Sequence, residues 1–176
     1  MPALFFFKTC RKGGFIVEKI SEGIQRRLSL LLVEDNLGDA HLVLDYLKGA
    51  EVPNRVTVLR DGMEAVDFLK RRGAYAIREA RLPDLILLDL GLPILNGKEV
   101  LREIKEDPEL SHIPVVILTG SQSDEERIQC YQSLANFYMV KPFDLSHFIA
   151  AMGFLEKVWL KPLLASSWSE KALSPA

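Results

Sequence analysis

The stretch Leu85-Ile86-Leu87-Leu88-Asp89-Leu90-Gly91-Leu92-Pro93 decides the fold. A short apolar run meets a single carboxylate, and a turn containing Gly and Pro follows. This pattern is typical of a buried parallel strand that ends at one edge of a sheet. Because ligands bind beyond the carboxyl ends of such strands, Asp89 lies where an acceptor or catalytic carboxylate is expected. On this stretch alone, a cap for the following segment explains Asp89 equally well.

Length and composition bound the class of protein. The 176 residues, 48% of them hydrophobic and 26% charged, are enough for one globular domain with some length to spare. A formal charge of -2 gives no reason to expect nucleic acid or a membrane surface as a partner. The two cysteines, Cys10 and Cys130, are far apart and fit no metal-binding spacing. We therefore expect a soluble protein without disulfides in the reducing cytoplasm.

Apolar runs alternate with helical patterns along most of the chain. Besides the run that ends at Asp89, strands are predicted at 28–33, 55–59, 115–118 and 137–140. Helices are predicted to begin after Asn36, at Asp61, at Gly97, at Ser123 and at Asp144. Five strands that alternate with five helices require right-handed crossovers and a parallel sheet covered on both faces.

The two ends of the chain differ from this pattern. Residues 1–27 are predicted to be an extension, in which Ile16, Ile20 and Ile24 have a spacing compatible with a short helix. The core domain is expected at 28–160, and residues 161–176 have the composition of a tail.

Polar side chains follow four of the predicted strands. Glu34-Asp35, Asp89, Thr119 and Lys141 all come at strand ends, so they should meet at one edge of the sheet. Three neighbouring carboxylates resist ionising together unless a cation joins them, and oxygen-only ligands suit Mg²⁺. Taken one at a time, the acidic pair also fits a solvated turn, Thr119 a simple strand end and Lys141 a surface charge.

This combination fits phosphoryl transfer. Asp89 would attack phosphorus in line, while the metal and Lys141 neutralise the oxygens of the phosphoryl group. The Thr119 hydroxyl would bind one of those oxygens after transfer. The product would be an acyl phosphate on Asp89.

The chain resembles the response-regulator receiver domains of two-component signalling. The matching motifs cover about residues 28–160, and the steps of 30 residues from Asp89 to Thr119 and 22 from Thr119 to Lys141 also match. These motifs are Leu32-Val33-Glu34-Asp35-Asn36, Leu87-Leu88-Asp89-Leu90 with Pro93 and Gly97, Thr119-Gly120, and Lys141-Pro142-Phe143. The resemblance implies a flavodoxin-like, doubly wound sheet with strand order 2-1-3-4-5.

The resemblance also implies roles for the residues at the strand ends. Asp89 would be the phosphorylated residue, and Glu34, Asp35 and Asp89 would hold Mg²⁺ together with the Gly91 carbonyl. Thr119 would be the switch hydroxyl and Lys141 the ammonium that binds the phosphoryl group.

The resemblance implies roles for two further positions. Tyr138 would be the aromatic side chain whose rotamer follows the switch hydroxyl, although packing at the sheet edge also explains it. The bond before Pro142 would be cis, which aims the preceding lysine into the pocket. The module would be a phosphoacceptor, not an enzyme with its own substrate, that promotes its own phosphorylation and dephosphorylation.

The expected partners follow from the same resemblance. The phosphoryl donor would be a sensor histidine kinase. An insertion at Arg71 to Arg81, together with Gly38-Asp39-Ala40 and Phe68-Leu69-Lys70, resembles the single-domain regulators that partner cyanobacterial phytochrome kinases. The last helix carries more apolar side chains than one face needs, which suggests a homodimer contact. Its candidate residues are Phe148, Phe154, Val158 and Trp159. The three histidines, His41, His112 and His147, are scattered and are expected at the surface or at caps.

Three other functions fit the sequence less well. A phosphatase with an aspartyl nucleophile usually has an acidic residue two positions after it, where this chain has Gly91. A flavin or nucleotide binder lacks its phosphate-binding loop here, because Glu34-Asp35 would repel phosphate. An adaptor that is not phosphorylated would not need a complete pocket.

Overall fold

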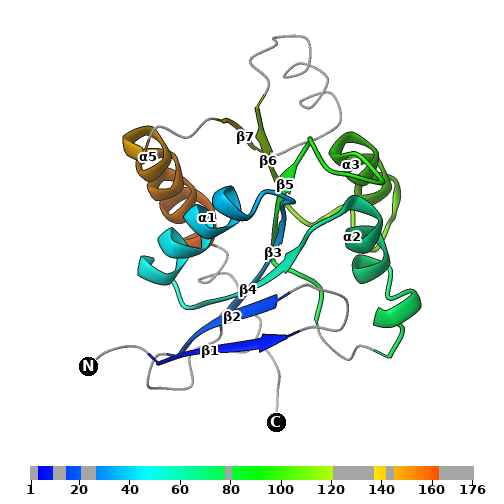
Figure 1. Cartoon of the computed structure of the whole chain (residues 1–176), viewed down its shortest axis with the longest axis horizontal. Coiled ribbons are helices and arrows are strands. Elements are labelled where there is room, and N and C mark those ends of the chain that lie inside the picture. Colours follow the sequence, from blue (N-terminus) through cyan, green and yellow to red (C-terminus); the bar gives the residue numbers. More distant parts are fainter. Residues whose placement is uncertain are drawn as a thin grey trace, which may run out of the picture.

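The computed structural model describes residues 4–9, 15–20, 27–77, 81–120, 137–141 and 145–162. Figure 1 shows a central sheet with helices on both sides. The strands are β1 (Leu4–Thr9), β2 (Phe15–Ile20), β3 (Leu28–Val33), β4 (Asn54–Leu59), β5 (Leu85–Asp89), β6 (Val115–Thr119) and β7 (Phe137–Val140). The helices are α1 (Leu37–Gly49), α2 (Gly62–Leu69), α3 (Gly97–Glu106) and α5 (Leu145–Leu155), with a 3₁₀ turn η1 (Gly73–Tyr75) and a π-helical turn η2 (Glu156–Leu160).

The sheet has the order β1-β2-β4-β3-β5-β6-β7. From β4 to β7 all neighbouring strands are parallel, which confirms the predicted order 2-1-3-4-5 of the receiver fold. Val33 pairs with Leu88, and Leu88 pairs with Ile117, so the ends of the three central strands lie next to one another. The described residues contain four α-helices, and the fifth predicted helix, from Ser123, lies outside them.

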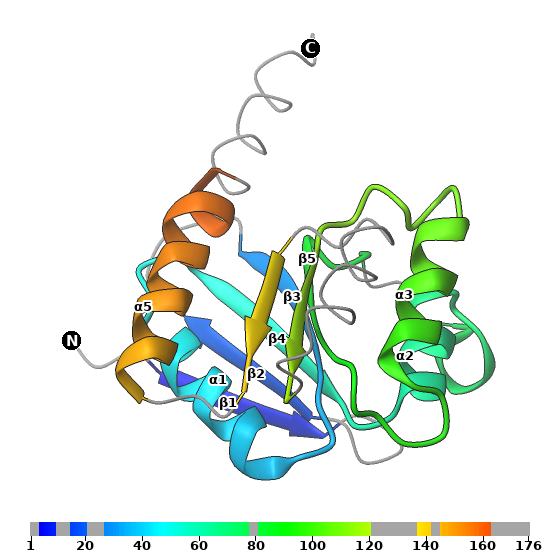
Figure 2. The same ribbon diagram turned by 90° about the horizontal axis from the view of Figure 1, so that it is seen from above.

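Two hydrophobic cores lie on opposite faces of the sheet because successive strand residues point to opposite sides. Leu30 and Leu87 join the core under α1 and α5, whereas Leu31 and Leu88 join the core under α2 and α3. Figures 1 and 2 show these helix pairs on the two sides of the sheet. Every residue of β5 is buried, and full burial of one leucine contributes about 2 kcal/mol. This burial fixes the strand that carries Asp89.

Side-chain caps determine where the helices begin. The Asn36 side chain accepts hydrogen bonds from the backbone N–H groups of Gly38 and Asp39, at 2.8 and 3.1 Å, so Asn36 caps α1 as predicted. Asp61 caps α2 by accepting the Glu64 N–H at 2.6 Å. The first turn of α1 is therefore held directly above the end of β3.

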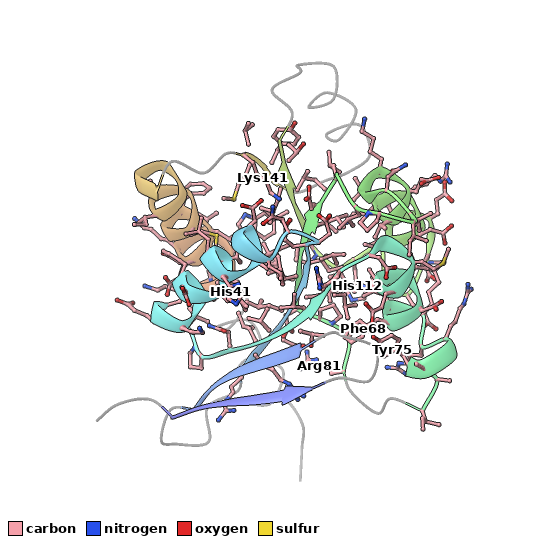
Figure 3. All side chains as sticks on the ribbon, in the orientation of Figure 1. His41, Phe68, Tyr75, Arg81, His112 and Lys141 are labelled. Carbon is pink, nitrogen blue, oxygen red and sulfur yellow. The ribbon has the colours of Figure 1, made fainter. Side chains whose placement is uncertain are left out.

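The insertion after α2 folds back onto that helix. The Tyr75 hydroxyl donates a hydrogen bond to Glu64 at 2.5 Å, and its ring packs edge-on against Phe68 with centroids 5.2 Å apart. Figure 3 shows Phe68 and Tyr75 together at the lower end of α2, far from Lys141 at the upper edge of the sheet. The described part of the insertion is thus anchored at the opposite end of the domain from the predicted site.

The N-terminal region corrects a sequence prediction. Residues 15–20 form strand β2, not the short helix that the spacing of Ile16 and Ile20 allowed. β2 pairs antiparallel with β4, placing Phe15 opposite Val58, and β1 pairs antiparallel with β2. The physical reason is that the free edge of β4 offers backbone partners to a segment rich in β-branched residues. Ile24 lies outside the described residues.

Helical spacing in the last helix predicts one inward apolar stripe that includes Ile149, Met152 and Leu155. In α5, Met152 and Leu155 are buried as this spacing predicts, but Ile149 is half-exposed and lies outside the stripe. None of the helices in the described ranges is long and apolar enough to span a bilayer.

Candidate functional site

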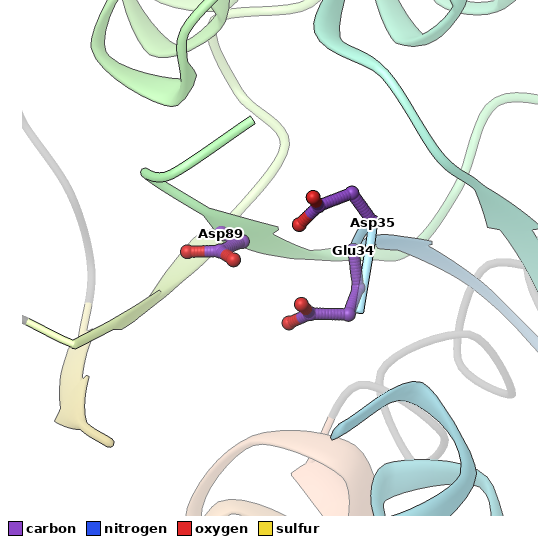
Figure 4. Close-up of side chains that lie close together, drawn as sticks. All are labelled: Glu34, Asp35 and Asp89. Carbon is purple, nitrogen blue, oxygen red and sulfur yellow. The ribbon is translucent and has the colours of Figure 1, made fainter. Parts of the chain in front are cut away.

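The strand ends bring the predicted polar residues to one edge of the sheet. Glu34 and Asp35 follow β3, Asp89 ends β5, Thr119 ends β6 and Lys141 follows β7. Figure 4 shows the three carboxylates turned toward a common space. One carboxylate oxygen from each of Glu34, Asp35 and Asp89 lies within 4.8 Å of the others.

Lys141 is placed at the centre of this group. Its ammonium lies 2.5 Å from a Glu34 oxygen, 3.0 Å from an Asp89 oxygen and 2.9 Å from an Asp39 oxygen. The Lys141 backbone N–H donates to the Thr119 carbonyl at 2.5 Å, which joins the ends of β6 and β7. One cation is therefore shared by three carboxylates.

An open cavity of about 450 Å³ lies above these side chains. Its floor is polar and largely buried, because Asp89, Thr119 and Lys141 are all less than a tenth exposed. The lining residues are Asp35, Asn36, Asp39, Asp89, Leu90, Gly91, Thr119, Gly120 and Lys141. A small anionic group can therefore reach Asp89 from solvent.

The pocket holds more negative than positive charge. Among the residues that the structure describes here, the carboxylates of Glu34, Asp39 and Asp89 contact the Lys141 ammonium, and the Asp35 carboxylate lies beside them. Burial, together with the nearby Asp89 charge, raises the pKa of Glu34 to about 7, although the Lys141 hydrogen bond opposes this rise. Burial lowers the pKa of Lys141, but its three carboxylate partners outweigh burial and raise that pKa above its usual value. The lysine therefore stays charged and cannot neutralise the pocket alone.

The donor set fits a divalent cation with a preference for oxygen. Three carboxylates without nitrogen or sulfur are the ligands that Mg²⁺ selects in proteins. Two positive charges would also reduce the summed formal charge of the described groups, which are Lys141 and the four carboxylates, from three negative to one negative. The residues present thus meet both the chemical and the electrostatic requirement for Mg²⁺.

The loop after β5 packs tightly against Asp89. A Cβ atom on Gly97 would clash with the Asp89 carbonyl oxygen and the Leu90 backbone, so only glycine permits this approach. The Gly91 N–H donates to the Asp89 side chain at 3.0 Å and fixes its rotamer. Asp89 is therefore oriented by its own loop.

Comparison with known proteins assigns the family. The sequence model of the response regulator receiver domain matches residues 30–153. The chain belongs to the response regulator receiver family. It is 40% identical over 132 residues to response regulator Rcp1 of Synechocystis sp. strain PCC 6803, covering 75% of this chain and 88% of Rcp1.

Solved structures agree with this assignment. The phosphorylated cyanobacterial phytochrome response regulator RcpA has a TM-score of 0.71 at 42% identity, covering 77% of this chain and 95% of RcpA. The Mn²⁺-bound form of Rcp1 has a TM-score of 0.70, covering 76% of this chain and 94% of that one. The receiver domain of the Pseudomonas aeruginosa histidine kinase PA1611, with magnesium in its active-site cleft, has a TM-score of 0.60 at 29% identity, covering 77% of this chain and 99% of that one. This receiver is thus a phosphoacceptor module that takes phosphoryl groups from histidine kinases.

The predicted switch aromatic and the candidate dimer residues lie outside the pocket lining or outside the described residues. Tyr138 is half-buried and packs against the core under α2 and α3. Phe154 and Val158 are nearly half exposed, whereas Trp159 packs against the core under α1 and α5. Neither the Phe148 side chain nor Pro142 belongs to the described part of the chain.

The two histidines whose side chains are described, His41 and His112, lie away from the pocket lining. The His41 ring lies 2.7 Å from the Leu37 carbonyl on the surface of α1, and His112 is exposed (Figure 3). The His147 side chain is outside the described set.

Sequence reasoning gave no role to two buried or paired carboxylates. Asp39, in the first turn of α1, contacts Lys141. Glu156, in η2, accepts the N–H groups of Glu51 and Val52 at 2.7 and 3.2 Å. For Asp39 the available signal was its position one turn after Glu34-Asp35, on the helix face that begins at the strand end.

Proposed function

We propose that Asp89 is the residue that accepts the phosphoryl group in this response regulator. The observation that carries the proposal is the contact between the Lys141 ammonium and Asp89, at 3.0 Å, beside the Glu34 and Asp35 carboxylates. A cation, an oriented carboxylate and an acidic cation site are the parts that phosphoryl transfer needs.

The chemistry is an in-line displacement at phosphorus. An Asp89 oxygen forms the new P–O bond while the P–N bond of the donor phosphohistidine breaks. The leaving imidazole keeps the bond's electron pair and takes a proton from solvent. Asp89 thereby becomes an acyl phosphate.

Glu34, Asp35 and Asp89 would hold Mg²⁺, with the Gly91 carbonyl as a further ligand. When bound, the ion supplies positive charge against the oxygens of the phosphoryl group. The donor-set chemistry and the excess of carboxylates in the pocket support this assignment.

Lys141 and Thr119 would bind the transferred group from the protein side. The Lys141 ammonium balances the charge that the phosphoryl group brings, and the Thr119 hydroxyl donates a hydrogen bond to one of its oxygens. Both residues are buried and both line the cavity, which supports these roles. A cis bond before Pro142 would aim the lysine.

The output would be a local change in packing. Movement of Thr119 toward the phosphoryl group would vacate space for Tyr138, and the surface around β7 and α5 would change with it. The exposed side chains Phe154 and Val158 on this side of the domain would join two copies of the chain. Phosphorylation would thus be coupled to protein association.

The acyl phosphate would be lost to water in the same pocket. Gly91 is exposed and adds no side chain over Asp89, so solvent can approach the phosphorus atom. The receiver would in this way promote its own dephosphorylation as well as its phosphorylation.

The kinase would be of the phytochrome type. The similarity to Rcp1 and RcpA over most of the chain supports this partner. Transfer from a purified phytochrome kinase at a rate above that from an unrelated histidine kinase is the expected result.

The test of the acceptor uses a small acyl phosphate donor with Mg²⁺, and intact mass reports the added phosphoryl group. Asp89→Asn should abolish labelling. Asp84→Asn is the matched control, because Asp84 lies just before β5 at the opposite edge of the sheet, where it accepts the Ser29 N–H. Labelling of Asp89→Asn at the level of the control would disprove the assignment.

A further inference from the structure

The Lys141 ammonium has no hydrogen-bond donor to spare. An ammonium carries three N–H groups, and three carboxylates lie within 3.0 Å of it, those of Glu34, Asp39 and Asp89. A phosphoryl oxygen can therefore bind Lys141 only by replacing one of these partners.

The three partners differ in what their release would cost. The Glu34 side chain is fully buried, so losing Lys141 would leave an uncompensated charge away from water. Asp89 is the proposed acceptor and stays next to the phosphoryl group in any case. The Asp39 side chain is 35% exposed, so water can replace the ammonium there.

We propose that Asp39 is a positioning residue that holds Lys141 before phosphorylation and is displaced from it by the phosphoryl group. This inference rests on the proposed role of Asp89. It assigns Asp39 as a competitor of the phosphoryl group for Lys141, so Asp39 shifts the balance toward the unphosphorylated state.

The competition has two effects of opposite sign. Without the Asp39 charge the pocket is less negative, so Mg²⁺ should bind more weakly, by roughly threefold. Without the competing carboxylate, a phosphoryl group should gain Lys141 more easily, so its analogue should bind roughly three- to fivefold more tightly. A residue that only maintained the shape of the pocket would weaken both ligands when replaced.

The test measures both affinities on the full chain by calorimetry. Mg²⁺ is titrated alone, and beryllofluoride is then titrated at saturating Mg²⁺ as the phosphoryl analogue. Asp39→Asn should weaken the first and tighten the second. Asp39→Glu, which keeps the charge, should restore the unsubstituted behaviour.

Asp45→Asn is the control for charge alone. Asp45 lies on the same helix, is exposed and pairs with Lys48 at 2.9 Å, so both affinities should stay within error. Beryllofluoride affinity that is unchanged or weaker in Asp39→Asn would overturn the inference while leaving the acceptor assignment intact. An unsubstituted protein that does not bind beryllofluoride would instead overturn the proposed function itself.

Discussion

Glu34 and Glu156 are both buried carboxylates beside α1, one near each end of the helix, but their neighbours are opposite in kind. Glu34 faces the carboxylates of Asp35 and Asp89, and it shares the Lys141 ammonium with Asp89. Glu156 accepts the backbone N–H groups of Glu51 and Val52, and the Tyr46 hydroxyl lies 3.4 Å away. The first carboxylate is crowded by like charge, and the second is surrounded by donors.

The difference separates a site for ligands from a structural contact. A buried carboxylate is stable when donors compensate it, as at Glu156. The crowding at Glu34 costs folding free energy, and a cation can recover that energy. Glu34, whose charge is not fully compensated, therefore lies at the edge of the sheet where a ligand enters. Glu156, whose charge is compensated by hydrogen-bond donors, lies near the opposite end of α1.

The largest expected effect is on Mg²⁺ affinity. Glu34→Gln removes one of three carboxylate donors and should weaken Mg²⁺ binding more than a hundredfold, since even indirect changes around a metal cost about 10- to 100-fold. Glu156→Gln removes a buried charge of the same type and should leave Mg²⁺ binding unchanged. Calorimetric titration of both variants measures this, and equal losses would break the distinction between the two ends.

The second effect is on stability as a function of pH, without divalent cations. The folded-state pKa of Glu34, about 7, lies above its ordinary value of 4.5. Folded protein then holds the proton more tightly than unfolded protein, so the stability from this group falls as pH rises from about 4.5 to about 7.

Glu34→Gln resembles the protonated form and should not show this loss. Above pH 7 it should be more stable than the unsubstituted chain, by at most about 3 kcal/mol, and near pH 4.5 the two should agree. Urea unfolding at several pH values in a chelator measures the gap. A gap that does not change with pH would contradict the crowding at Glu34.

The third effect is a loss of stability at the opposite end of α1. Glu156→Ala leaves the N–H groups of Glu51 and Val52 without their acceptor and should destabilise the fold by about 1–3 kcal/mol. The control is Glu51→Ala, which removes an exposed carboxylate paired with Lys161 and should leave the unfolding midpoint unchanged. Lower acyl phosphate labelling of folded Glu156→Ala would show that this contact is not only structural.

The smallest effect tests backbone strain at the ligand edge. Ile94 has φ of +68° and is 79% exposed, in a three-residue turn closed by the Leu95 N–H and the Pro93 carbonyl. Asparagine tolerates this conformation better, so Ile94→Asn should stabilise the fold by about 1 kcal/mol. Ile77→Asn is the control, because Ile77 is exposed without a positive φ. A destabilised Ile94→Asn would mean that the Ile94 side chain makes a stabilising contact.

The sequence predicted the part of the fold that depends on local patterns. Buried parallel strands are continuous apolar runs, so the polar residue that ends each run could be placed at a common edge without knowing any contact. The contact between Asp39 and Lys141 depends on how α1 packs over the sheet, which periodicity does not specify. Glu156 could not be placed because its donors belong to the loop between α1 and β4, far away in the sequence.

Strand β2 shows a different limit. Its isoleucines recur at a spacing that both a helix and a strand can accommodate, and the edge of β4 decides between the two. The sequence pattern of one segment carries no information about a sheet edge that another segment forms.

The pairing of β2 with β4 also has a consequence for synthesis of the protein. The ribosome makes Phe15 before its partner Val58, and at 5–20 residues per second a delay of several seconds separates them. During that interval β2 lacks β4 as a partner, so the nascent segment exposes an unpaired strand edge, and exposed edges of this kind make folding intermediates prone to aggregation. The order of translation, and not only the final contacts, therefore bears on the yield of folded protein.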